Sequence, residues 1–173
     1  MKQKKAEKRN KRITINQGEK SKVLPLAEAL KLLQQAFAEQ HYGGAIQVAT
    51  EILRQQPSAE TARIILYRAL ATSEQFAQLN EACNDQLDLY PRDVISLEYK
   101  AHALRQLGKD AEALSLLEKA VALKKTNTRL LNALGTAYKE NGESAKALDC
   151  FQRATTIKPS LGSAYWNRSD LVK

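Results

Sequence analysis

The chain has 173 residues, which is the length of one ordinary domain. Apolar residues make up 43% of it, enough for a buried core, so a chain that is disordered throughout is excluded. Only 7 glycines and 4 prolines occur among abundant alanine, leucine, glutamine, glutamate and lysine, so the composition favours helices over a β-sandwich or barrel.

The first 22 residues form a basic segment that differs from the rest of the chain. Their net charge is +7, whereas residues 23–173 carry a net charge of only +1. Because the segment is rich in lysine and has no apolar periodicity, we expect residues 1–22 to be a disordered leader. Three roles stay open for it: a solubilising segment, a nuclear-import signal, or an arm that binds nucleic acid or an anionic surface. The candidate polyanion-binding residues are Lys4, Lys5, Lys8, Arg9, Lys11 and Arg12.

No apolar stretch of signal-peptide or membrane-spanning length follows this basic segment. The sequence therefore predicts a cytoplasmic protein without a transmembrane segment. The absence of any aromatic residue before Phe37 disfavours nucleic-acid binding by base stacking, so nucleic acid is expected to bind only through the charge of the leader.

A 34-residue period organises the chain from residue 26 onward. Pro57, Pro91 and Pro159 fall on one position of a 34-residue grid, and Lys125 occupies the remaining place. The period predicts four units within a repeat domain that spans 23–173, and each unit is expected to hold two helices. The units are 26–59, 60–93, 94–127 and 128–161.

The fourth unit shows the pattern most clearly. Leu130, Leu134 and Tyr138 recur at steps of four residues, as on one face of a helix, and Gly142 then marks a break. Because the break is short, the two helices of a unit are expected to be antiparallel. A small residue such as Gly135 is expected where their backbones approach closely.

This pattern resembles the tetratricopeptide repeat (TPR). The third unit departs from the family at Lys100 and Lys125, and the second has Tyr67 where a small residue is usual. The resemblance implies an all-α, right-handed superhelical solenoid of helix-turn-helix TPR units, with four units and a terminal helix. The fourth unit carries the fullest match, at Leu134, Gly135, Tyr138, Gly142, Ala147, Phe151, Ala154 and Pro159.

Residues 162–173 look like the first helix of a fifth unit that lacks its second helix. One interpretation is a capping helix that covers the last apolar face of the array. The other is that the natural chain continues. The phrase Ser163-Ala164-Tyr165-Trp166 is similar to the junction between the TPR units and the catalytic domain of bacterial TPR-sulfotransferases.

No catalytic or metal-binding motif stands out in the sequence. His41 and His102 are the only histidines, and neither has a partner at metal-ligand spacing. Cys83 and Cys150 lie on apolar stripes two units apart, which predicts buried thiols that form no disulfide. The sequence thus predicts a protein that is not an enzyme within these residues and that uses no cofactor or metal.

The resemblance implies that a partner binds in a concave groove lined by the first helix of each unit. Four cations line this groove, and they are expected to hold an acidic peptide or a C-terminal carboxylate. They are Arg68, Arg105, Arg129 and Lys139. Leu30 and Ile64 stand where the chaperone-binding members of the family need polar groups, so a chaperone tail is disfavoured. The predicted groove residues are Arg68, Glu98, His102, Arg105, Arg129, Asn132, Thr136, Lys139, Trp166 and Asn167.

These observations predict a scaffold or adaptor that binds a peptide or a partner helix in its groove. One alternative is the N-terminal recruiting module of a larger enzyme of the sulfotransferase or glycosyltransferase type. A further alternative is polyanion binding through the basic leader, which would weaken steeply with salt.

Overall fold

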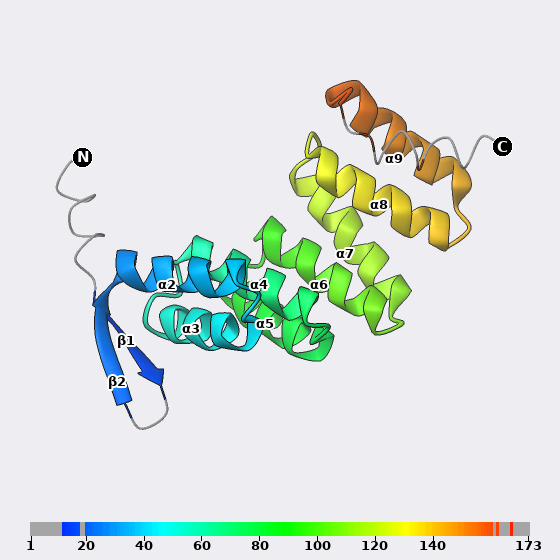
Figure 1. Cartoon of the computed structure of the whole chain (residues 1–173). Coiled ribbons are helices and arrows are strands. Elements are labelled where there is room, and N and C mark those ends of the chain that lie inside the picture. Colours follow the sequence, from blue (N-terminus) through cyan, green and yellow to red (C-terminus); the bar gives the residue numbers. More distant parts are fainter. Residues whose placement is uncertain (1–11, 18–19, 161, 163–166, 168–173) are drawn as a thin grey trace. The chain divides into compact units, whose positions relative to one another are not determined.

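The computed structural model describes residues 12–17, 20–160, 162 and 167. These residues belong to two compact units, Met1–Gln75 and Phe76–Lys173, and each unit is described by itself (Figure 1). Trp166 and most of the predicted terminal helix, and five of the six candidate polyanion-binding residues, lie outside the described residues.

Eight helices make up most of the described chain (Figure 1). In the first unit these are α2 (Leu26–Ala38), α3 (Tyr42–Gln55) and α4 (Glu60–Thr72). In the second they are α5 (Phe76–Leu89), α6 (Val94–Gln106), α7 (Asp110–Leu123), α8 (Thr128–Glu140) and α9 (Ser144–Ile157). Helix starts recur every 34 residues, at 26, 60, 94 and 128 and again at 42, 76, 110 and 144. The predicted all-α fold of helix-turn-helix repeats is confirmed.

In each of the four turns that join the two helices of a repeat, one residue adopts the left-handed backbone conformation. In the first turn the N–H of His41 then donates to the carbonyl of Ala36, 2.9 Å away, and Gln40 N–H donates to Phe37. This pair of bonds is the Schellman motif, which satisfies the carbonyls at the end of a helix. The left-handed residues lie 34 apart and are Gln40 (φ 61°), Glu74 (φ 58°), Gly108 (φ 73°) and Gly142 (φ 79°).

The core of the second unit is built from the apolar faces of α6, α7, α8 and α9. Helices α8 and α9 approach so closely at Gly135 that a Cβ there would stand 2.5 Å from the ring of Phe151. The predicted close contact at Gly135 is therefore confirmed. Cys83 and Cys150 are buried and form no disulfide, as predicted, and burial, assisted by Asp149, raises the pKa of Cys150 to about 11.

The described part of the first unit begins with a β-hairpin that was not predicted from the sequence. Strands β1 (Arg12–Gln17) and β2 (Lys20–Pro25) pair antiparallel, with Ile13 opposite Leu24. The prediction of a disordered leader is wrong for residues 12–17 and 20–22, while residues 1–11 and 18–19 lie outside the described residues.

The hairpin is ordered because it packs on the first helix pair. Ile13 and Ile15 are 0% and 1% exposed, and both strands contact α2 or α3. The side chain of Gln55 adds two bonds to the backbone of Thr14: its Oε1 accepts from the Thr14 N–H (3.0 Å), and its Nε2 donates to the Thr14 carbonyl (2.8 Å). The hairpin therefore serves as a capping element for the first repeat.

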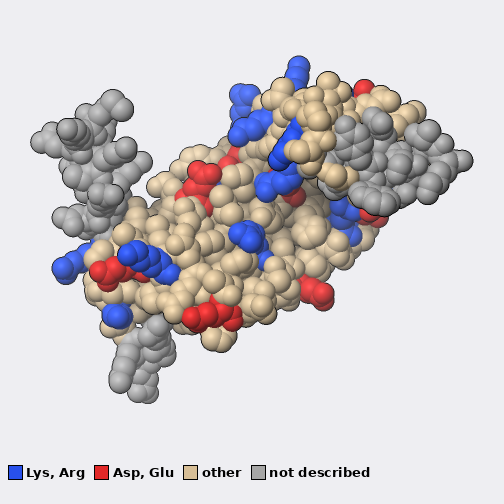
Figure 2. All heavy atoms as spheres, turned by 45° about the horizontal axis from the view of Figure 1, so that its top comes forward, with Lys and Arg blue, Asp and Glu red and all other residues tan. Residues whose placement is uncertain are grey.

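Acidic and basic side chains are interspersed on the face of the molecule drawn in Figure 2. This distribution agrees with the net charge of +1 over residues 23–173. Among the described residues, no helix is both long enough and apolar enough to cross a membrane.

Candidate functional site

The candidate site lies in the second unit, on helices α6 and α8. Side-chain caps 34 residues apart fix the starts of both helices. Asp93 accepts a hydrogen bond from the N–H of Ser96 (3.0 Å), and Asn127 accepts from the N–H of Arg129 (3.1 Å) and Leu130 (3.2 Å). Each cap satisfies N–H groups that have no partner within the helix. The caps therefore stabilise the first turns of α6 and α8, from which the helices lead into the site.

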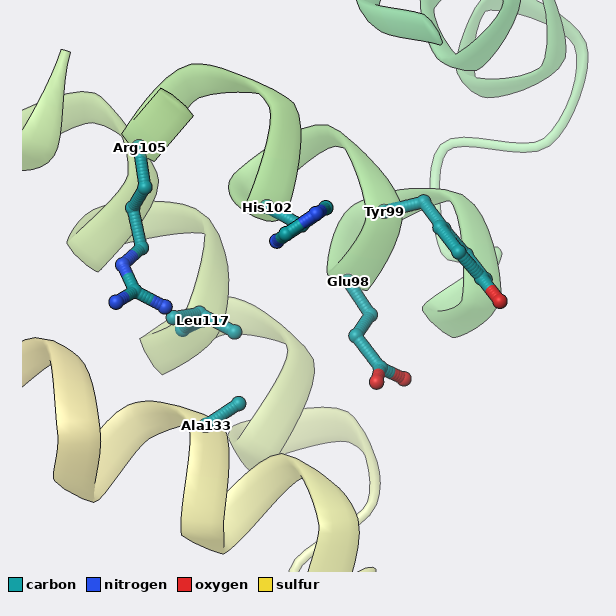
Figure 3. A pocket seen from close by; sticks show the side chains of 6 residues that line it. All are labelled: Glu98, Tyr99, His102, Arg105, Leu117 and Ala133. Carbon is teal, nitrogen blue, oxygen red and sulfur yellow. The ribbon is translucent and has the colours of Figure 1, made fainter. Parts of the chain in front are cut away.

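A pocket of about 180 Å3 lies beside α6 (Figure 3). In the close-up, the carboxylate of Glu98 and the guanidinium of Arg105 lie toward opposite ends, with His102 between them. Leu117 of α7 and Ala133 of α8 form the apolar side across from α6. The pocket thus has an anionic end, a cationic end and an apolar floor. Its lining residues are Glu98, Tyr99, His102, Arg105, Leu117 and Ala133.

Two ion pairs connect α6 to α8 at this site. Arg129 Nη2 donates to Glu98 Oε2 at 2.7 Å. Arg105 donates to both oxygens of Glu140, from Nε at 3.1 Å and from Nη2 at 2.5 Å. Two of the four cations predicted to hold an acidic peptide are therefore already paired within the chain. An incoming carboxylate would have to displace Glu98 or Glu140 to reach them.

Burial shifts the pKa of two ionisable groups of the pocket, Glu98 and His102. It raises the pKa of Glu98, and the positive charge of Arg129 opposes that rise. It lowers the pKa of His102 below 6.5, and Arg105 lowers it further, so the imidazole is neutral at pH 7. The ring of His102 packs edge-on against Phe76, with 5.8 Å between ring centroids.

A cluster of amide and hydroxyl groups brings Asn167 to two residues of α8, Asn132 and Thr136, and so gathers three of the predicted groove residues. Asn167 Nδ2 donates to Asn132 Oδ1 at 3.2 Å and lies 3.5 Å from Thr136 Oγ1. Thr136 Oγ1 in turn donates to the backbone carbonyl of Asn132 (3.0 Å). The cluster places polar side chains on the same helix that carries Ala133 of the pocket.

The remaining predicted residues lie elsewhere. Arg68 belongs to the first unit, where its guanidinium stacks over the ring of Phe37 at 4.7 Å. Lys139 lies in the last turn of α8, and Arg12 is exposed on β1. In the described part of the chain, no group of three or more His, Cys, Asp or Glu side chains is placed to hold a metal ion.

Comparison with known proteins identifies the repeat. A sequence model of the N-terminal TPR repeats region of Psidin matches residues 66–163, which is more than half of the chain. The chain belongs to this family of TPR proteins. A curated relative, protein FlbA of Caulobacter vibrioides, is 32% identical over 79 residues, which cover 46% of this chain. The matched part is 13% of the length of FlbA.

Solved TPR structures share the fold at low sequence identity. MamA of Desulfovibrio magneticus is 19% identical with a TM-score of 0.71, over 84% of this chain and 82% of MamA. A TPR protein of Thermus thermophilus is 20% identical with a TM-score of 0.69, over 84% and 80% of the two chains. The first TPR of Spaghetti (RPAP3), solved with an HSP90 peptide, is 19% identical with a TM-score of 0.58, over 61% and 84%. Membership of the TPR family supports a role as a protein-interaction scaffold.

Proposed function

We propose that this chain is a protein-interaction scaffold that binds a peptide segment of a partner protein on helices α6 and α8. The observation that carries the proposal is the pocket beside α6, which combines an apolar floor with charged groups at its two ends. Peptide and ligand sites commonly have this composition, because apolar area supplies affinity and a few polar groups fix the orientation.

The site is also held in place before a ligand arrives. The Arg105–Glu140 ion pair joins α6 to α8, and both helices start from capped N-termini. A rigid site loses little conformational freedom on binding, so more of the contact energy remains as affinity. The polar groups of Asn132 and Thr136 on α8 offer further contacts for the backbone of an extended peptide.

Adaptor function, a cytoplasmic location, recruitment for a larger enzyme and polyanion binding stay predictions from the sequence. The residues similar to the TPR-sulfotransferase junction, 163–166, lie outside the described residues.

A site-specific photocrosslinker tests the proposal. We would place benzoylphenylalanine at Tyr99, which lines the pocket, and as a control at Lys119, an exposed position of α7. The partner segment crosslinked from position 99 would be synthesised as a peptide, and its affinity for the purified chain measured by calorimetry.

A pair of variants then decides whether the peptide occupies the pocket. Ala133→Arg fills the pocket floor and is expected to weaken binding about tenfold or more, whereas Ala111→Arg, at an exposed position of α7, leaves it unchanged. Equal crosslinking from positions 99 and 119, or equal affinity of the two arginine variants, contradicts binding at this site.

A further inference from the structure

Glu98 is a largely buried carboxylate with an unused acceptor atom. Its side chain is 16% exposed, and its one hydrogen bond comes from Arg129 to Oε2. Within the residues that the structure describes, Oε1 accepts no hydrogen bond. A carboxylate has about four lone-pair positions, so Oε1 is open to a further donor. Glu98 can therefore gain from a second donor that enters the pocket.

Arg129 is a weak and replaceable partner for this carboxylate. Its side chain is 63% exposed, and it uses a single nitrogen to reach Glu98. Exchange of Arg129 for another cation keeps the buried carboxylate paired and returns an exposed guanidinium to water, so it costs little. Burial raises the pKa of Glu98, and the charge of Arg129 opposes that rise only in part.

The surroundings of Glu98 suit a cation better than an anion. His102 is neutral at pH 7, so it does not repel a positive group, and a neutral imidazole offers one acceptor nitrogen. The described residues provide no hydrogen bond to the ring of His102. At the other end of the pocket Arg105 is bound to Glu140 through two of its nitrogens, so its charge is compensated.

The rest of the pocket suits an aliphatic stem. Leu117 and Ala133 form its apolar side, and the close-up shows both across from the helix that carries Glu98 (Figure 3). Lysine and arginine side chains pack their methylene groups on apolar surface while their charged ends reach polar groups. A volume of about 180 Å3 accommodates one such side chain.

From this geometry we infer that the pocket is specific for a basic side chain of the partner, a lysine or an arginine, whose charged end binds Glu98 and displaces Arg129. The inference rests on the proposed function and reverses the charge of the partner that the sequence suggested. An acidic peptide would be repelled by Glu98 in the pocket. The two nearby cations, Arg105 and Arg129, are already paired with carboxylates of the chain.

The test uses short peptides built from alanine and glycine, blocked at both ends, with a single central residue that varies. Lysine is compared with norleucine, which has the same stem without the charge, and with glutamate. Binding to the full chain is followed by NMR from the amide shifts of α6 and α8. The lysine peptide is expected to bind about tenfold more tightly than the norleucine peptide, since a buried charge pair commonly contributes this much.

Three variants give effects of different sign. Glu98→Gln keeps the shape of the side chain and is expected to reduce binding of the lysine peptide about tenfold. Arg129→Ala removes the competing cation and is expected to increase binding severalfold. Glu112→Gln removes an exposed carboxylate of α7 outside the pocket, so it serves as the control and is expected to change nothing. Melting curves check that each variant is folded.

Three results would overturn the inference. They are weaker lysine binding by Arg129→Ala, tighter binding of the glutamate peptide, and no saturable shift with the lysine peptide up to about 5 mM. The proposed function is judged separately by the crosslinked partner peptide. If that peptide binds in the pocket and its affinity does not change in Glu98→Gln, the scaffold function stands and the basic specificity fails.

Discussion

The turn within each repeat requires one residue with a left-handed backbone, and the repeats use different residue types at this position. Glycine adopts this conformation without steric cost, and Gly108 and Gly142 use it in the third and fourth repeats. The first two repeats place Gln40 and Glu74 there instead. For residues with a Cβ the left-handed conformation costs about 1–2 kcal/mol, so these two turns hold avoidable strain.

Replacing Glu74 with glycine is therefore expected to stabilise the protein. The relief of strain exceeds the added freedom of the unfolded chain, and we expect a gain of about 0.5–1 kcal/mol in the free energy of unfolding, measured with urea. The reverse change, Gly142→Ala, is expected to cost about 1 kcal/mol. Lys119→Gly, within helix α7, is the control and should destabilise by about 1 kcal/mol. A loss of stability in Glu74→Gly would contradict the turn geometry.

Gly135 provides a second prediction at the scale of one residue. Three ring atoms of Phe151 lie within 2.5–2.9 Å of the place where a Cβ would stand. Gly135→Ala must push α8 and α9 apart, and overpacking of this kind costs about 1–3 kcal/mol of unfolding free energy. Gly44→Ala is the matched control, because no atom lies within 4 Å of its added Cβ and α3 should gain helix propensity. Equal effects of the two changes would contradict the close contact.

His102 gives a prediction for pH dependence. Burial and the charge of Arg105 lower its pKa, so an NMR titration should show a midpoint below 6.5. Arg105→Gln should raise this pKa only part of the way to 6.5, because burial remains. Arg153→Gln, which removes a cation of α9 outside the pocket, should leave the pKa of His102 unchanged.

The same shift sets the sign of a stability effect. A base whose pKa is lowered by folding stabilises the native state above its unfolded pKa, and this contribution is lost as pH falls through the folded value. The wild type should therefore lose stability relative to His102→Asn as pH falls below 6.5. A constant difference between the two proteins from pH 7 to the folded pKa would contradict the burial of a neutral imidazole.

The spacing of residues in the sequence was enough to predict part of the site. Glu98, His102 and Arg105 are four and three residues apart, so a helix must place them on one face, and they line one pocket. The two ion pairs were not predictable in this way. Their partners are 31 and 35 residues away, and the pairing depends on side-chain conformations that a 34-residue register does not specify.

At the scale of elements, the β-hairpin shows where sequence patterns fail. The apolar alternation that marks β1 is only Ile13-Thr14-Ile15, and it lies among lysines that indicate a solvated segment. The bonds that order the strand come from Gln55, 41 residues away. A local pattern contains no information about that contact. The helices were predictable because their apolar periodicity repeats four times in the same register.

Gln55 gives the prediction for this element. Its side chain replaces the neighbouring strand that the backbone of Thr14 lacks on that side. Gln55→Ala leaves the N–H and carbonyl of Thr14 without these partners, which costs about 1–3 kcal/mol when such groups are partly buried. Hydrogen exchange at the Thr14 amide should accelerate accordingly.

Gln35→Ala is the control for the loss of a glutamine, because the Gln35 side chain bonds only to the exposed carboxylate of Glu39. It should leave the exchange of the Thr14 amide unchanged. Equal exchange rates of Thr14 in the wild type and in Gln55→Ala would mean that the hairpin is held by Ile13 and Ile15 alone.

At the scale of the whole molecule, the 34-residue repeat contains two kinds of position: those whose residue type recurs in each repeat and those whose residue type varies. Helix starts, turns and small core residues repeat, and they hold the helices in place. Side chains such as Glu98 and Arg129 do not repeat as a pattern, and they give the pocket its charges. A repeat fold thus permits its binding chemistry to vary without changing the packing that positions it.

The boundary between the leader and the repeat domain gives a prediction for the molecule as a whole. A chain that begins at residue 12 keeps both strands, whereas one that begins at residue 23, the boundary expected from charge, loses β1. Removing β1 takes away Ile13 and Ile15, two fully buried side chains, and each such loss costs about 1.5–3 kcal/mol of burial free energy. Urea unfolding should therefore match the wild type for residues 12–173 and show a less stable first unit for residues 23–173. If both shortened chains unfold like the wild type, the hairpin contributes nothing to the fold and the domain begins at α2.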